Sequence, residues 1–153
     1  MSATEETSSS GMLLERDGLL AELERRLDLA ARGAGSMTMI AGEAGAGKTS
    51  LVNELALRVA GRARVMTGGC DPLSTPRPLS PLLDVISEPG SGLGDLLEEA
   101  GDTVRLFSEF LTRLKGTIRP TVLIIKDVHW ADEGTLDFIR FLGRRVMPTH
   151  WLR

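Results

Sequence analysis

Gly42-Glu43-Ala44-Gly45-Ala46-Gly47-Lys48-Thr49 is the stretch of sequence that decides the fold. It matches the phosphate-binding pattern GxxxxGK[ST] at every fixed position. A short apolar run at residues 37–41 precedes it and predicts a buried strand. Residues 50–60 follow it and predict a helix, because leucine and valine recur at four-residue spacing and Gly61 stands at the expected C-cap. The pattern therefore has the strand, loop and helix context that a phosphate-binding loop requires.

The residue types in this stretch suit a polyphosphate. Glycines let the loop backbone curl so that its N–H groups point at the phosphates, and the first helical turn adds unpaired N–H groups and partial positive charge. Lys48 is expected to reach the β- and γ-phosphates, and the Thr49 hydroxyl to ligate Mg²⁺. The nucleotide-binding residues predicted in this stretch are Gly42, Glu43, Ala44, Gly45, Ala46, Gly47, Lys48, Thr49 and Ser50. The alternative is a glycine turn that merely joins a strand to a helix, and the full motif in context disfavours it.

Composition narrows the class of protein. The chain has 153 residues, which suggests one domain, and a net charge of −3 with no evident basic face, so direct nucleic-acid contact by this segment is not expected. Cys70 is the only cysteine, which excludes an internal disulfide and fits a reducing compartment. No signal peptide and no membrane-length apolar run is visible. We therefore expect a cytoplasmic location with no membrane partner.

The pattern along the chain predicts a disordered tail at residues 1–11, a partial α/β domain at residues 12–145 and an irregular tail at residues 146–153. Strands are expected at residues 64–70 and 120–125, and further helices at residues 13–31, 81–86, 102–115 and 135–145. The run at 120–125 is apolar and β-branched, so we expect a strand covered on both faces of a parallel sheet.

The end of that strand carries the second set of candidate residues. A phosphate-binding loop needs an acid at the tip of a neighbouring strand to hold Mg²⁺ and to align the attacking water. Here the strand ends in Lys126 and Asp127, and a protonated lysine cannot ligate a metal. Asp127 is therefore the predicted catalytic residue and, with Thr49, the predicted metal ligand. The alternative reading of Asp127 is a helix or turn cap.

Other polar residues near the strand tip have simpler interpretations. His129 and Asp132 follow the tip, where ligands of open α/β sheets bind, but local hydrogen bonding explains them better than catalysis does. Packing explains Trp130 better than base stacking does. Arg16, judged by spacing alone, is a solvated charge on the first helix.

Four segments in this order resemble a known family. They are Leu14-Glu15-Arg16-Asp17, the stretch from Ala41 to Thr49, Gly69-Cys70-Asp71 with Thr75-Pro76-Arg77-Pro78-Leu79, and Asp127-Val128-His129-Trp130-Ala131-Asp132. Together they resemble the N-terminal ATPase region of the AAA-type and STAND-type ATPases. That module is found in large bacterial LuxR-family transcriptional regulators and in adenylate-cyclase-associated proteins. The resemblance covers about residues 13–145.

The resemblance implies an α/β fold of the P-loop NTPase type, with a parallel sheet flanked by helices, that binds ATP and Mg²⁺. It makes residues 42–49 the Walker A loop and places Arg16 near the adenine. It makes Asp127 one acid of the Walker B pair and residues 129–132 the family's hallmark extension. ATP is the expected partner, and protein partners or self-association are left open.

Two departures from the family pattern bear on activity. The family normally has an acid where this chain has Lys126, so we expect weakened Mg²⁺ binding and hydrolysis. The chain also stops before the strand expected between the P-loop strand and the Walker B strand, which predicts a sheet that is incomplete at the C-terminus, with exposed edges. The alternatives to an ATP-binding module are a true ATP hydrolase and a truncated interaction fragment with no nucleotide chemistry.

Overall fold

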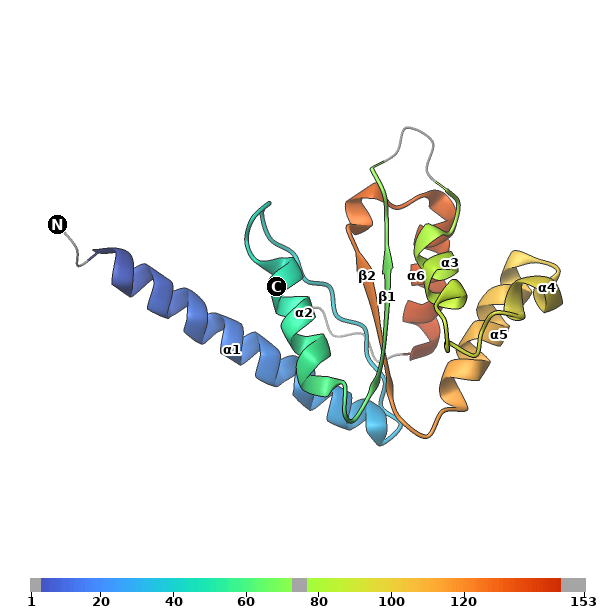
Figure 1. Cartoon of the computed structure of the whole chain (residues 1–153), viewed down its shortest axis with the longest axis horizontal. Helices are drawn as coiled ribbons and strands as arrows, with labels where there is room; N and C mark the ends of the chain where they lie inside the picture. Colours follow the sequence, from blue (N-terminus) through green and yellow to red (C-terminus); the bar gives the residue numbers. More distant parts are fainter. Residues whose placement is uncertain (1–3, 73–76, 147–153) are drawn as a thin grey trace.

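The structure is a computed structural model that describes residues 4–72 and 77–146. Helices on both sides of a short sheet make up this part of the chain (Figure 1). In chain order the elements are α1 (Thr4–Ala31), α2 (Lys48–Val59), β1 (Arg64–Gly69), α3 (Ser80–Ser87), α4 (Leu96–Ala100), α5 (Thr103–Lys115), β2 (Thr121–Lys126), the 3-10 helix η1 (Val128–Trp130) and α6 (Glu133–Val146).

β1 and β2 pair in parallel, in a register that runs from Arg64 opposite Thr121 to Gly69 opposite Lys126. Parallel strands place their carboxyl ends at one edge, so both strands end on the same side of the molecule. Figure 1 shows the loop that precedes α2 at this same end. A parallel pair between helical layers is compatible with an α/β fold of the P-loop NTPase type, as the sequence predicted.

Two hydrophobic clusters lie on opposite faces of the sheet, because successive strand residues point to opposite sides. On one face Val65 and Val122 pack with the buried residues of α1 and α2. On the other face Met66, Leu123 and Ile125 pack with α3, α5 and α6. The residues of β2 thus sort by parity into an α2 side and an α3 side.

The approach of α3 to β1 depends on a glycine. A Cβ atom built on Gly68 would collide with the backbone of Pro81, in the first turn of α3. Pro81 suits that turn because its fixed φ and missing N–H cost nothing there. α3 can therefore pack directly on the backbone of β1.

Residues 37–41, predicted as a buried strand, form no strand in the structure. Met39 is 60% exposed, while Met37 and Ile40 pack against the two different clusters. A strand needs a hydrogen-bonded partner, and in the described part of the chain only β1 and β2 pair with each other. The prediction of a buried strand was therefore wrong, because no strand of the described residues pairs with this segment.

The residues of β2 are less buried than the sequence predicted. Each of its residues is half-buried, although the apolar run predicted cover on both faces. Within the described chain β2 pairs along one edge, with β1, so its backbone and side chains are open on the other. Both faces of β2 are covered by helices, so the exposure of its residues comes from the unpaired edge of the strand.

The predicted boundaries differ most at the N-terminus. The structure has helix from Thr4, where the sequence predicted a disordered tail through residue 11. Extending an existing helix fixes one residue for each new hydrogen bond, which is far easier than starting one. The predicted tail at 146–153 lies outside the described residues beyond Val146, which ends α6. The short helix α4 was not predicted.

A search of the helices within the described ranges finds none that is both long enough and apolar enough to span a bilayer.

Candidate phosphate-binding site

The loop before α2 is curled. Gly45 and Gly47 have φ of +82° and +79°, a left-handed conformation that L-residues with side chains rarely adopt. The N–H of Ala46 donates to the carbonyl of Glu43 at 3.1 Å, which closes a turn inside the loop. Residues 42–46 are exposed to solvent. The motif therefore forms a curled, solvent-exposed loop, the kind of backbone from which a phosphate-binding nest is made.

Lys48 folds back across this loop. Its Nζ donates hydrogen bonds to the carbonyls of Gly42 at 2.6 Å and Glu43 at 2.7 Å. These contacts hold the ammonium against the loop backbone, next to the first turn of α2. The loop thus carries the positive charge of Lys48 directly beside its own carbonyls.

The N-terminus of α2 is free of a side-chain cap. Gly47 occupies the N-cap position and has no side chain to accept a hydrogen bond from the first turn. Thr49 and Ser50 in that turn are exposed. The first-turn N–H groups and the helix dipole are therefore directed at the space beside the loop, where an anion is favoured.

Arg16 lies one layer away, on α1. Its guanidinium donates to the Glu54 carboxylate of α2 at 2.7 Å, and both side chains are about one-third exposed. The structure thus uses Arg16 to join α1 to the second turn of α2. Its predicted role beside an adenine stays a prediction.

Lys126, the last residue of β2, lies on the side of the sheet that faces α2. It has the same parity as Val122, which packs with the α2 cluster, and its Nζ donates to the Asn53 side-chain oxygen of α2 at 3.3 Å. Asn53 lies four residues after Thr49, hence on the same face of α2. The cation at the end of β2 therefore projects toward the helix that follows the phosphate loop.

Asp127 departs from the strand geometry. Its φ of 56° and ψ of 42° place it in the left-handed region as the N-cap of η1, and its carbonyl accepts from the N–H of Trp130 at 2.9 Å. Burial raises the pKa of the Cys70 thiol, and the carboxylates of Asp132 and Asp127 add to that rise. The predicted catalytic and metal-binding roles of Asp127 stay predictions.

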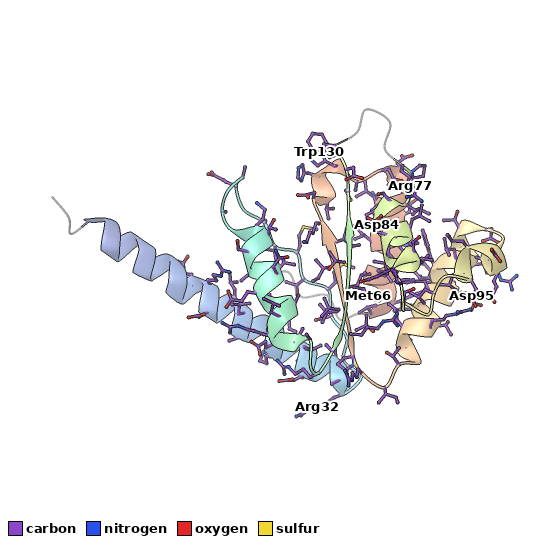
Figure 2. The ribbon with its side chains drawn as sticks, viewed as in Figure 1. Arg32, Met66, Arg77, Asp84, Asp95 and Trp130 are labelled. Atoms are coloured by element: carbon purple, nitrogen blue, oxygen red, sulfur yellow. The ribbon has the colours of Figure 1, made fainter. Side chains whose placement is uncertain are left out.

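The segment after Asp127 divides into an exposed and an anchored part. His129 and Trp130 are exposed, with ring centroids 5.1 Å apart, and Trp130 stands with Arg77 at the carboxyl end of the sheet (Figure 2). Asp132 caps α6 by accepting from the N–H and the hydroxyl of Thr135. It also accepts from the N–H of Leu79 at 3.3 Å, which ties α6 to the start of α3.

The pKa of Asp132 reflects this double role. Partial burial pushes the pKa upward, but the hydrogen bonds from Thr135 and from the N–H of Leu79 outweigh it and hold the pKa below its ordinary value of 3.8. The carboxylate therefore stays charged as a structural cap.

The residues beside α2 fit Mg²⁺ poorly. Thr49 and Asn53 offer neutral oxygens, while Lys126 places an ammonium at the strand position from which a carboxylate would hold the metal. Among the described residues no group of three or more His, Cys, Asp and Glu side chains is arranged to hold an ion. On this side of β2 the neutral oxygen of Asn53 therefore accepts from the Lys126 ammonium, and no carboxylate stands at the strand position expected to hold a metal.

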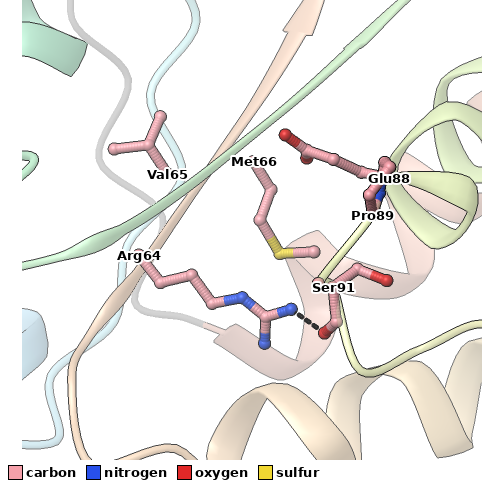
Figure 3. Close-up of a pocket in the computed structure, with 7 residues that line it drawn as sticks. Arg64, Val65, Met66, Glu88, Pro89 and Ser91 are labelled. Carbon is pink, nitrogen blue, oxygen red and sulfur yellow. Dashed lines mark hydrogen bonds between the residues drawn. The ribbon is translucent and has the colours of Figure 1, made fainter.

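A cavity elsewhere does not belong to this site. It has a volume of about 180 Å³ and lies between the start of β1 and the loop after α3 (Figure 3). Arg64 reaches across it to the Ser91 carbonyl. Because Arg64 begins β1, this cavity is at the amino ends of the strands, away from the phosphate loop.

One residue at the site was missed by sequence reasoning. Asn53 was treated as part of an ordinary helix, although its spacing of four from Thr49 places it on the helix face that carries the Thr49 hydroxyl. Side chains along β2 alternate between the two faces of the sheet, so Lys126 is predicted to lie on the same face as Val122. The two signals together could have paired Asn53 with Lys126.

Comparison with curated proteins and with solved structures gave no match. The model of one protein family, described as the AAA ATPase domain, matches residues 12–150. The match includes the phosphate loop, both strands and the segment after β2, which makes this a nucleotide-binding ATPase module. The chain belongs to the AAA ATPase domain family.

Proposed function

We propose that the chain is the ATP-binding module of an AAA/STAND-type signalling ATPase, of the kind found in LuxR-family transcriptional regulators. The observation that carries this proposal is the curled, exposed loop at the uncapped N-terminus of α2, with Lys48 Nζ against the loop backbone. The family match supports the nucleotide. The regulatory context rests on the four segments that resemble those regulators.

The geometry suggests how a triphosphate binds. Loop N–H groups and the first turn of α2 donate to phosphate oxygens, and Lys48 exchanges part of its contact with the Gly42 and Glu43 carbonyls for contact with the terminal phosphates. The flanking residues Ala44, Ala46 and Ser50 carry small side chains, so the backbone can approach the anion closely.

Hydrolysis requires more than binding. The attacking water must be aligned and the developing charge on the phosphoryl group stabilised. Lys126 occupies the strand-tip position from which an acid would hold a metal, and Asp127 lies in the left-handed N-cap of η1. We therefore propose that this module binds ATP and turns it over slowly.

The test is binding of a fluorescent ATP analogue to the whole chain and to Lys48→Ala. Loss of the ammonium should weaken binding by about tenfold or more, equivalent to about 1.4 kcal/mol. Lys115→Ala is the matched control, because Lys115 is an exposed lysine in the last turn of α5, on the opposite side of the sheet. Equal affinity of Lys48→Ala and the unmodified chain would refute the proposal.

The second candidate is an interaction fragment without nucleotide chemistry. The half-buried strand β2, which pairs along one edge within the described chain, favours it. Thermal melting separates the two candidates, since a ligand that binds only the folded state raises the melting temperature. A rise with ATP supports the ATP-binding module, and an unchanged melt at saturating ATP supports the fragment.

A further inference from the structure

The end of β2 presents a cation to the phosphate site. Val122 and Lys126 share one face of the strand, and Val122 packs in the cluster formed by α1 and α2. Lys126 lies four residues after Val122 on that face, beyond the cluster, where its Nζ donates to the Asn53 side-chain oxygen at 3.3 Å. The chain thus places an ammonium between the strand tip and the phosphate-loop helix.

The residues around this ammonium define its role. Asn53 holds it from one side as a neutral acceptor, so its charge is not cancelled by that contact. Thr49, one turn nearer the phosphate loop on the same helix face, is exposed. Among the described residues, no carboxylate forms an ion pair with Lys126. The positive charge therefore remains available to an anion bound at the loop.

We propose that Lys126 serves as a built-in cation for the bound nucleotide, so that this site holds ATP with little dependence on Mg²⁺. The inference rests on the proposed ATP-binding function and adds to it the ionic form of the ligand. Lys126 and Lys48 contact the polyphosphate from two sides. Asn53 is a positioning residue that keeps Lys126 on the α2 face.

Electrostatics favours Lys126 alone at this position over Lys126 together with a Mg²⁺ ion. A lysine carries a compact charge on a flexible four-carbon stem, so it can follow a phosphate oxygen over a few ångströms. Two positive charges that compete for one position repel each other, and a divalent ion there would sit beside the ammonium. The lysine therefore replaces part of the charge neutralisation that Mg²⁺ supplies, but not its ordered coordination of the attacking water.

The experiment measures the affinity of the whole chain for a fluorescent, non-hydrolysable ATP analogue, in excess Mg²⁺ and in EDTA. For the unmodified chain the two dissociation constants should agree within about threefold, which is less than 1 kcal/mol. Lys126→Glu should bind about tenfold or more weakly in EDTA and recover when Mg²⁺ is added, because the acid can then act with the metal.

Three further variants give the result its controls. Lys126→Met keeps the length of the side chain without its charge, and should lose affinity in EDTA with less recovery in Mg²⁺ than Lys126→Glu. Asn53→Ala removes the hydrogen bond that positions Lys126. It should raise the ratio of the dissociation constant in EDTA to that in excess Mg²⁺ by a few-fold. Lys115→Glu makes the same charge change on α5 and should leave the ratio unaltered. Circular dichroism checks that each variant is folded.

The outcomes separate this inference from the proposed function. A large Mg²⁺ dependence in the unmodified chain, or an unchanged affinity of Lys126→Glu in EDTA, would overturn the role of Lys126 and would leave ATP binding intact. Binding that is insensitive to Lys48→Ala would overturn the ATP-binding function itself. If Lys126→Glu fails to fold, Lys126→Met and Asn53→Ala decide the question by the same ratio.

Discussion

The two sides of the sheet are built differently. The α3 side has the larger core, in which Phe107, Phe110 and Phe138 make ring contacts at centroid distances of 5.0 and 5.4 Å. The α2 side has a smaller aliphatic cluster centred on Leu51 and Leu55. Outside that cluster α1 and α2 are joined by ion pairs such as Arg16 with Glu54.

The comparison shows that the candidate site belongs to the less deeply packed side. The phosphate loop, α2 and the Lys126 side chain all lie there, and residues 37–41 lead into the loop without joining the sheet. The α3 side acts as the rigid support of β1 and β2. Stability and ligand binding should therefore respond differently to changes on the two sides.

The largest expected effect is on the α3 side. Phe138→Ala should lower the free energy of unfolding by about 3–5 kcal/mol, because the ring is 1% exposed and contacts two other phenylalanines. Leu55→Ala on the α2 side should lower it by about 2–3 kcal/mol, since the smaller cluster can relax around the cavity. Urea denaturation measures both. ATP-analogue affinity of the folded protein should fall for Leu55→Ala more than for Phe138→Ala, and the reverse order would contradict the division of labour.

A smaller effect is expected at Asp132, which joins two elements of the α3 side. Asp132→Ala removes the cap of α6 and the contact with Leu79, and should cost about 1 kcal/mol at neutral pH. The folded-state pKa lies below 3.8, so the stabilisation is complete above that value and is lost as pH falls through the folded pKa. The difference in unfolding free energy between wild type and variant should therefore shrink below pH 3.8.

Asp132→Asn is the control for this prediction. Asparagine keeps one of the two acceptor oxygens and is itself a good helix N-cap, so it should be less destabilising than alanine at neutral pH. Its stability relative to Asp132→Ala should not change with pH in the acid range. A constant gap between wild type and Asp132→Ala from neutral to acid pH would show that the charge of the carboxylate contributes nothing.

The smallest effect is expected from the ion pairs of the α2 side. Arg62 donates to Glu24 at 2.6 Å and to Asp28 at 2.7 Å, and so links the chain after α2 to α1. Exposed ion pairs contribute little and are screened by salt. Arg62→Ala should lower the melting temperature slightly at low salt, and the difference should vanish near 1 M salt.

Arg140→Ala is the matched control for the ion-pair prediction. Arg140 pairs with Asp137 within α6, so its loss removes an exposed ion pair without separating two elements. If Arg62→Ala lowers the melting temperature no more than Arg140→Ala at low salt, the pairs between α1 and α2 do not help to hold the site.

Local pattern was sufficient for most of the helices. The spacing of apolar residues predicted α5 within one residue of its bounds, and Pro81 correctly marked the first turn of α3. The curled phosphate loop follows from glycines at positions that take positive φ. These features depend on neighbours close in sequence, which is why one sequence was enough.

Features that depend on distant partners could not be predicted in this way. The apolar run at residues 37–41 predicts a strand only if another strand pairs with it. The contact of Asp132 with Leu79 joins residues 53 positions apart, and no local signal marks it. The Asp127 backbone turns away from the strand direction because η1 begins there, which spacing alone does not reveal.

The pairing of β2 has a final consequence for the phosphate site. The ladder runs from the Arg64 N–H on the Pro120 carbonyl to the Cys70 N–H on the Lys126 carbonyl, so it uses alternate peptide groups of β2. The peptide groups of Thr121, Leu123 and Ile125 face the opposite edge. A partner that pairs with that edge and displaces β2 would also displace its last residue, Lys126. If the partner changes the affinity of the site for an anion in this way, the anion changes the affinity of the edge for the partner by the same factor.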